Sequence, residues 1–292
     1  MSGPIIGIIG GSGLYQIDGL ADIAWHRVDS PFGAPSDELC FGTLAGQQVV
    51  FLPRHGRGHE LPPSGINFRA NIDALKRCGV TDIVSLSAVG SLREDLAPGD
   101  FVVVDQFIDR TFAREKSFFG PGCVAHVSMA HPVCGRIGDA LATAAPGAGV
   151  SVKRGGTYLV MEGLQFSTLA ESELYRSWRC DVIGMTNMPE AKLAREAEIC
   201  YATVAMVTDY DCWHPGHAAV SVDMILSVLN ANAAHARALI RAVVPLLAGH
   251  AGPCHQGCHR ALEHALVTAP AHRDPAILAR LDAVAGRVLG VQ

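Results

Sequence analysis

Two aspartates stand two residues apart in the stretch TDYDCW, directly after an apolar, strand-like run at residues 201–207. Because residues i and i+2 of a strand face the same side, the carboxyl groups of Asp209 and Asp211 are predicted to lie together. A partly buried pair of carboxyl groups tends to hold a proton between them, so it can donate to and accept from a heterocyclic ring. A solvated pair or a cation site is the alternative interpretation.

A basic loop, RHGRGH, follows the apolar run at residues 49–52. It contains two guanidinium groups and two imidazoles, those of Arg54, His55, Arg57 and His59. Guanidinium groups bind phosphate through charge-assisted, often paired hydrogen bonds, so the loop predicts a cationic pocket for an anion. A solvated basic loop is the alternative.

Small and hydroxyl-bearing residues follow other apolar runs. In SAVGS, after residues 82–86, Ser87 offers a hydroxyl and the small Ala88 lets backbone N–H groups face a ligand. In MEGLQF and GMTNMPE, Phe166 can stack on a flat ring, Thr186 can donate to an anion and Met185 can lie against an apolar face. A lone phenylalanine is more often a core residue, so each of these signals is weak alone.

The first apolar run, IIGIIGGSGLY, breaks into Gly10, Gly11, Ser12 and Gly13. Glycines let the backbone turn sharply and approach a ligand closely. The dinucleotide fingerprint G-x-G-x-x-G does not fit, because Gln16 and Ser12 stand where glycine is required, which disfavours a nicotinamide-dependent dehydrogenase. What remains is a turn whose N–H groups and Ser12 hydroxyl suit phosphate, or a tight structural turn.

The segment CHQGCH at residues 254–259 suggests a metal site formed by Cys254, His255, Cys258 and His259. It lacks a second ligand pair at zinc-finger spacing, so no metal is predicted.

The composition favours a cytoplasmic, oligomeric enzyme. Of 292 residues, 49% are hydrophobic and 17% charged, with a net charge of −5, and such an apolar chain suggests surface buried between subunits. No basic stripe points to nucleic acid, and the apolar runs are too short for a bilayer. The nine scattered cysteines, and the absence of a signal peptide before the first run, favour reduced thiols in the cytoplasm.

Strand-like and helix-like segments alternate along the chain. Strands are expected at the beginning of the first apolar run, from about residue 4, and at 49–52, 82–86, 101–104 and 201–207, and helices at 67–77, 131–144, 168–178, 189–196 and 222–247. This alternation predicts an α/β fold: one domain with a mixed, mostly parallel twisted sheet flanked by helices. The domain is expected over 1–248, with 249–292 as a C-terminal helical extension. Ligand sites of such sheets lie beyond the carboxyl ends of the strands.

Several motifs together resemble one known family. In order, the chain contains GIIGGSGLY, RHGRGH, NFRANIDALK, SAVGSLREDLAPGD, VVDQFIDRT, EGLQFST, MTNMPEAKLAREAEICYA and TDYDCW. From about residue 4 to residue 245 this order is similar to the 5′-methylthioadenosine phosphorylases of the trimeric purine nucleoside phosphorylase family.

The resemblance implies a nucleoside phosphorylase-like fold, no cofactor, inorganic phosphate as co-substrate, and a homotrimer with active sites near subunit contacts. It assigns residues to four groups, in sites shared between subunits. Phosphate is held by Ser12, Arg54, His55, Ser87, Ala88 and Thr186. Met185 lies against the ribose, and the purine is held by Phe166, Ser167, Asp209 and Asp211. The methylthio pocket is lined by Val222 and Ile225, with His126 entering from a neighbouring subunit.

The activity implied is reversible phosphorolysis of 5′-methylthioadenosine to adenine and 5-methylthioribose 1-phosphate, a step of purine and methionine salvage. Protonated Asp209 is expected to donate to the purine N7, with Asp211 helping to retain that proton. Two alternatives stay open. One is a phosphorylase of 6-oxopurines such as methylthioinosine, whose members carry Glu at the position of Ser167 and Asn at that of Asp209. The other is a catalytically weakened nucleoside-binding homologue, since Leu164-Gln165 stands where the family usually has Pro-Arg.

Overall fold

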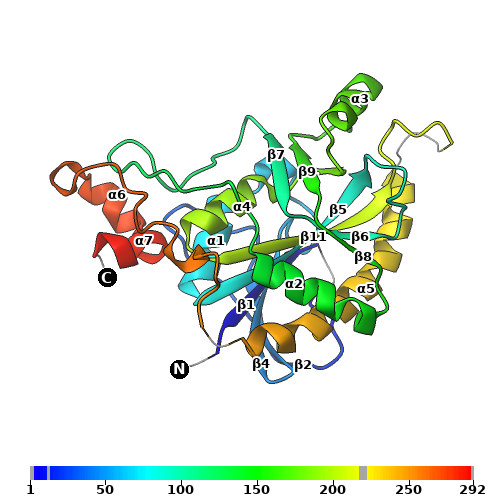
Figure 1. The fold of residues 1–292 in the computed structure, drawn as a ribbon. Helices are drawn as coiled ribbons and strands as arrows, with labels where there is room; N and C mark the ends of the chain where they lie inside the picture. Colours follow the sequence, from blue (N-terminus) through cyan, green and yellow to red (C-terminus); the bar gives the residue numbers. More distant parts are fainter. Residues whose placement is uncertain (1–2, 12–13, 217–221, 251, 291–292) are drawn as a thin grey trace.

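The computed structural model describes residues 3–11, 14–216, 222–250 and 252–290, with the side chains of 222–227 and 229 left out (Figure 1). In these residues eleven strands form one sheet: β1 Ile5–Gly10, β2 Leu20–His26, β3 Leu39–Leu44, β4 Gln47–Pro53, β5 Val80–Ser91, β6 Phe101–Val103, β7 Gln106–Arg110, β8 Val152–Arg154, β9 Thr157–Met161, β10 Val182–Gly184 and β11 Cys200–Asp209.

The α-helices lie between and after these strands. They are α1 Phe68–Arg77, α2 Gly135–Ala144, α3 Leu169–Ser177, α4 Asn187–Glu196, α5 Val222–Ala248, α6 Pro275–Arg280 and α7 Asp282–Leu289. The predicted helices are confirmed, but α2 begins at Gly135 instead of residue 131. Pro132 disfavours helical backbone at residue 131, and Cys134, directly before the helix, has an extended backbone with a ψ of 111°.

The sheet is centred on β5, which pairs in parallel with β1 and β11 and antiparallel with β10. Parallel pairing also joins β1 to β4, β9 to β7 and β10, and β6 to β8, which confirms a mixed, mostly parallel sheet. The sequence patterns did not predict β2, β3 or β7 to β10, several of which are short or lie toward the edges of the sheet.

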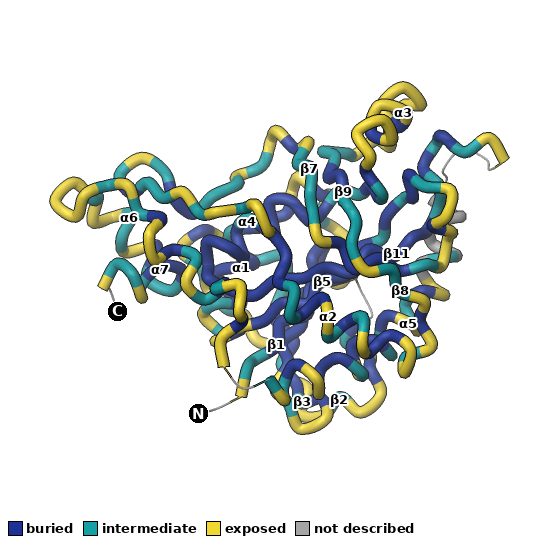
Figure 2. Tube along the Cα trace, viewed as in Figure 1, coloured by how far each residue is buried: buried dark blue, intermediate teal, exposed yellow. Residues whose placement is uncertain are grey.

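Helices cover both faces of the sheet. On one face, Ile72 of α1, Ala191 of α4 and Val284 of α7 pack into one apolar core. On the other face, Ile137 of α2 and Leu239 of α5 pack into a second core. Figure 2 shows the buried strands at the centre and exposed residues along α3 and α6.

The C-terminal extension contains α6 and α7 and packs on the sheet domain. Leu262 and Leu281 are fully buried in the same core as α1 and α4. Arg77 of α1 forms an ion pair with Asp282 at the start of α7.

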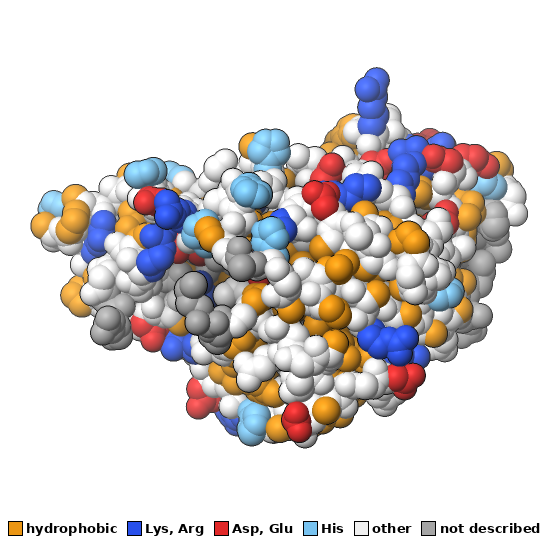
Figure 3. Space-filling view, turned by 60° about the horizontal axis from the view of Figure 1, so that its bottom comes forward, with side chains coloured by type: hydrophobic (Ala, Val, Ile, Leu, Met, Phe, Trp, Pro, Cys, Tyr) orange, Lys and Arg blue, Asp and Glu red, His pale blue; other side chains and the backbone are white. Residues whose placement is uncertain are grey.

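The surface carries both signs of charge. On the face in Figure 3, lysines and arginines lie among acidic side chains instead of gathering in one basic area. Among the described helices, none combines the length and the apolar character that crossing a membrane requires.

Candidate active site

The carboxyl ends of β1, β4, β5 and β11 meet at one edge of the sheet. The backbone N–H of Arg54, just after β4, donates to the carbonyl oxygen of Gly10 at the end of β1, at 2.9 Å. Arg54 also reaches Ser85 and the carbonyl oxygen of Leu86 on β5. Three strands therefore place their polar residues together, as predicted for a mostly parallel sheet.

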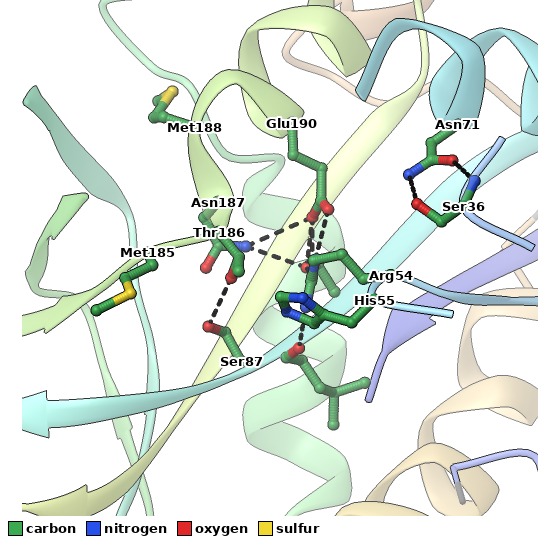
Figure 4. A network of polar contacts seen from close by, with 12 residues as sticks. Ser36, Arg54, His55, Asn71, Ser87, Met185, Thr186, Asn187, Met188 and Glu190 are labelled. Carbon is green, nitrogen blue, oxygen red and sulfur yellow. Dashed lines mark hydrogen bonds and ion pairs between the residues drawn. The ribbon is translucent and has the colours of Figure 1, made fainter. Parts of the chain in front are cut away.

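Arg54 is the centre of a buried polar network (Figure 4). Its guanidinium donates from Nε to Glu190 Oε2 at 2.8 Å and from Nη2 to Glu190 Oε1 at 3.1 Å. Glu190 in turn accepts from the hydroxyls of Ser85, at 2.7 Å, and Tyr201, at 2.8 Å. Burial opposes the charge on Arg54, but the Glu190 carboxylate raises its pKa above the usual value, so the guanidinium stays charged.

The prediction that Arg54, His55, Arg57 and His59 form one cationic pocket is wrong. Arg57 is turned to the surface, where it pairs with Asp37 and Glu38 and lies over the ring of Trp25. His59 is exposed and stacks on His55 with ring centroids 4.3 Å apart. The loop thus contributes one buried guanidinium, Arg54, whose charge is balanced by Glu190.

His55 is buried and its charged form is disfavoured. Burial is the largest cause that lowers the pKa of this imidazole to about 4, and the charge of Arg54 adds to it. The ring atom Nδ1 lies 2.8 Å from the carbonyl oxygen of Leu61. A carbonyl only accepts, so Nδ1 carries the hydrogen and Nε2 of the neutral ring is an acceptor.

We expect the His55 imidazole to remain neutral until the pH falls to about 4. Between about pH 6.5 and that value the unfolded chain binds a proton that the folded chain refuses, so this residue's contribution to stability is lost as pH falls. Carbon-13 labelled histidine followed by NMR measures the titration, and a His55→Gln variant assigns the resonance. Titration of that resonance near the ordinary histidine value, about 6.5, would contradict the burial argument.

Two hydroxyls lie beside this network. Ser87 Oγ is 3.0 Å from Thr186 Oγ1 and 2.9 Å from the buried Tyr158 hydroxyl. Ala88, the next residue of β5, pairs with Met206 of β11. The pair of Ser87 and Thr186, with the remaining N–H of Arg54 Nη1, offers donors of the kind that bind phosphate oxygens.

Asp209 and Asp211 lie together, but not on one strand face as predicted. Asp209 ends β11, whereas Asp211 lies in the following turn with a φ of 51°. The backbone N–H of Asp211 donates to Asp209 Oδ1 at 2.8 Å. Both side chains lie against Gly90, where a Cβ atom would come within 2.9 Å of Asp209 Oδ1. A side chain at position 90 would therefore displace the carboxyl groups.

Burial acts on both carboxyl groups in the same direction. Burial raises the pKa of Asp209 and of Asp211, and the charge of Asp209 further raises that of Asp211. Thr208 Oγ1 lies 2.7 Å from Asp209 Oδ2 and 3.1 Å from the carbonyl oxygen of Val89. The Thr208 hydroxyl donates to Asp209 at the shorter of these distances, which lowers the pKa of that carboxyl against the effect of burial, as does the N–H of Asp211.

The predicted purine residues approach these carboxyls. The hydroxyls of Ser172 and Ser167 lie near enough to Asp211 to lower its pKa against the effect of burial, so Ser167 lies near this carboxyl. The thiol of Cys212 contacts the carbonyl oxygen of Ser167 at 3.3 Å. Phe166, directly before Ser167, is 43% exposed. The Phe166 ring is therefore accessible to a ligand.

Sequence reasoning missed Arg114, which holds the loops around the site. Its guanidinium donates to the carbonyl oxygens of Met185 at 2.6 Å, Met188 at 2.7 Å and Glu162 at 2.8 Å. It thereby fixes Met185 next to Gly163, at the beginning of the loop that leads to Phe166. Glu190 was also missed, because its bond to Arg54 spans 136 residues and no local pattern signals it.

The profile of the phosphorylase superfamily matches residues 5–245. The chain belongs to the phosphorylase superfamily. S-methyl-5′-thioadenosine phosphorylase of Cereibacter sphaeroides is 65% identical over 285 residues and 98% of each chain. A methylthioadenosine phosphorylase from an antarctic soil metagenomic library has a TM-score of 0.92 at 49% identity, covering 97% of this chain and 99% of its own. A mutant adenosine/methylthioadenosine phosphorylase of Schistosoma mansoni, in complex with methylthioadenosine, has a TM-score of 0.79 at 38% identity, covering 85% and 93%.

The structure does not show four of the predicted site residues of this phosphorylase superfamily member near Arg54 and Asp209. Ser12 lies outside the described residues, as do the side chains of Val222 and Ile225, whose backbone belongs to α5. His126 is exposed, and its backbone N–H donates to the carbonyl oxygen of Ala265 in the C-terminal extension.

Proposed function

We propose that this chain cleaves 5′-methylthioadenosine with inorganic phosphate, giving adenine and 5-methylthioribose 1-phosphate. One observation carries the proposal: Asp209 lies at Gly90 of β5, three residues beyond the Ser87 hydroxyl. Three residues of a strand span roughly 10 Å, which is the length scale of a ribose between a purine and a phosphate. The curated relatives that bear the methylthioadenosine phosphorylase name match nearly the whole chain.

Cleavage of the N-glycosidic bond leaves positive charge on the ribose and negative charge on the departing purine. An anionic phosphate next to C1′ stabilises the first charge, and a proton donor at N7 stabilises the second. Asp209, whose pKa is raised by burial, is the donor in this proposal. Asp211 helps to retain the proton on Asp209 and reads the 6-amino edge through Asp209 or through water.

The residues proposed to bind phosphate act through hydrogen bonds more than through net charge, because the Glu190 carboxylate balances the positive charge of Arg54. In the proposed complex the hydroxyls of Ser87 and Thr186 donate to the phosphate, and one N–H of Arg54 joins them. In the proposed complex Nε2 of neutral His55 accepts a hydrogen bond from a P–OH group of the phosphate, which keeps its proton. Monoprotonated phosphate is then the form that the site selects.

The proposed reaction uses phosphate as a co-substrate and no catalytic cofactor. Donors on the protein handle the charge that develops on both fragments, and phosphate itself is the nucleophile. We also place the reaction in the cytoplasm, because none of the nine cysteines forms a disulfide, as expected in a reducing compartment.

Base selectivity tests this proposal. With phosphate present, methylthioadenosine is expected to be cleaved with a higher kcat/KM than methylthioinosine. A preference for methylthioinosine would support the 6-oxopurine alternative and contradict the role given to Asp209.

We further propose a homotrimer in which each site borrows His126 from a neighbour. Large apolar side chains are exposed on and around α3: Phe112 82%, Leu164 64%, Leu169 53%, Leu174 46% and Trp178 41%. Contiguous exposed apolar residues of this kind mark protein interfaces. His126 is itself exposed and held in place by the C-terminal extension.

Subunit complementation tests the shared site. Co-expressed His126→Ala and Asp209→Asn chains are expected to be more active than either variant alone, because mixed trimers contain some sites with both residues intact. A mixture of Arg54→Ala and Asp209→Asn is the control, since both residues serve the same chain's site and no intact site forms. A fully active monomer in sedimentation would rule the shared site out.

A further inference from the structure

Four cysteines from three separate segments converge in the core beneath α2 and α5. Cys134 is the residue before α2, and Cys200 is the first residue of β11. Cys254 and Cys258 come from the segment after α5. All four are buried, and their sulfur atoms all lie within 4.8 Å of one another.

The backbone holds these thiols in place. The N–H of Cys134 donates to the carbonyl oxygen of Tyr201 at 2.8 Å, which ties the Cys134 segment to the start of β11. The N–H of Cys258 donates to Cys254 Sγ at 3.3 Å. Three residues separate Cys254 from Cys258, a spacing found between the paired ligands of structural zinc sites.

The local sequence around CHQGCH therefore does not contain the second pair of possible metal ligands. Cys134 and Cys200 supply it from positions far from CHQGCH, which the spacing argument used in predicting no metal does not take into account. His255 is exposed, and among the described residues the cluster of possible ligand atoms includes neither His255 nor His259. The sulfur atoms of a tetrahedral zinc site lie about 3.8 Å apart, as follows from zinc–sulfur bonds of about 2.3 Å. The four sulfur atoms here lie within 4.8 Å of one another, so a small contraction of the cluster would bring them to the spacing of a zinc site.

A buried cation faces the cluster. Arg195 of α4 is buried, and its Nη1 lies 3.5 Å from Cys258 Sγ. Its Nη2 donates to the carbonyl oxygen of His131, which has no formal charge. A buried charge is stable when it is paired, and a protonated thiol offers no counter-charge. Four thiolates around a divalent ion carry two net negative charges, so Arg195 would have its partner.

We propose that Cys134, Cys200, Cys254 and Cys258 bind one Zn²⁺ ion. Thiolate sulfur is a soft ligand that selects zinc over magnesium or calcium. Four protein ligands leave no open position, so the site is structural. Cys200 and Asp209 are the two ends of β11, roughly 30 Å apart at strand spacing, so the ion takes no part in the proposed reaction. It ties the start of the C-terminal extension to the sheet.

Metal analysis of the full-length protein, purified under reducing conditions, tests the site. We expect one zinc per chain, and X-ray absorption at the zinc edge should show four sulfur neighbours at about 2.3 Å. Cys258→Ser should lose the zinc, whereas Cys180→Ser should keep it, because Cys180 is an equally buried free thiol in a different apolar cluster.

A second measurement on the wild-type protein tests the site even if the Cys258→Ser variant fails to fold. Wild-type protein stripped with a chelator and a reversible thiol reagent, then reduced, should bind Co²⁺ with the visible bands of tetrahedral thiolate coordination. Zinc loading should raise its Tm while kcat at low temperature stays unchanged. Zinc-free protein that does not bind Co²⁺, bound iron in place of zinc, or disulfides among these cysteines would each overturn the proposal. None of these outcomes bears on phosphorolysis.

Discussion

Asp209→Asn is expected to lower kcat/KM for 5′-methylthioadenosine roughly ten- to a hundredfold, the effect of leaving one buried polar group unpaired. Adenine presents N7 as an acceptor and its 6-amino group as a donor on one edge. A protonated carboxyl donates to the first and accepts from the second, which suits Asp209. An amide offers donors for both acceptors of a 6-oxopurine, so the variant should shift toward methylthioinosine.

The shift should be relative and not a complete exchange, because Ser167 remains unchanged. Specificity constants for both nucleosides on both proteins provide the measurement. Asp139→Asn is the matched control, since Asp139 is an exposed residue of α2 that pairs with Arg154. A constant ratio between the two nucleosides would show that Asp209 does not read the base.

Glu190→Gln is expected to destabilise the protein by about 3–5 kcal/mol, because it leaves the buried charge of Arg54 without its partner. Arg54→Met should destabilise it similarly, and it should also weaken the use of phosphate. Replacing both residues by methionine should give a protein more stable than either single variant, since no buried charge is then unpaired. Asn187 still donates to both Ser85 and Tyr201 in that protein.

Urea denaturation measures the stabilities, and the apparent affinity for phosphate measures the function. Arg154→Met removes a partly exposed ion pair and should change stability by less than about 1 kcal/mol. If the double-methionine variant used phosphate as well as the wild type, Arg54 would be a structural residue and not a phosphate ligand.

The sequence predicted the buried strands, whose apolar residues are consecutive, better than the contacts between residues that are far apart in the chain. The apolar runs of β4 and β11 predicted buried strands, and the residues after them do gather at one edge. The expectation for Asp211 failed because β11 ends at Asp209, so the alternation of a strand no longer applies. The helix predicted from Pro189 is part of α4, which begins at Asn187 but is interrupted at Met188, where the residue before the proline has extended backbone with a φ of −121°.

Other features depend on contacts that no local pattern records. The charge of Arg54 looked available for phosphate, but Glu190 balances it from 136 residues away. Arg57 looked like a ligand residue, yet Asp37 and Glu38 hold it at the surface. The four buried cysteines come from three segments, and only their packing in the core makes them neighbours.

Phosphate dependence is the most direct test of the account. The protein, 5′-methylthioadenosine and inorganic phosphate are followed together by phosphorus NMR and by chromatography of the purine. One sugar 1-phosphate should form for each adenine released, and omission of phosphate should stop both. Adenine released without phosphate would indicate hydrolysis, and no adenine release in its presence would indicate a binding protein; either result would contradict the proposed phosphorolysis.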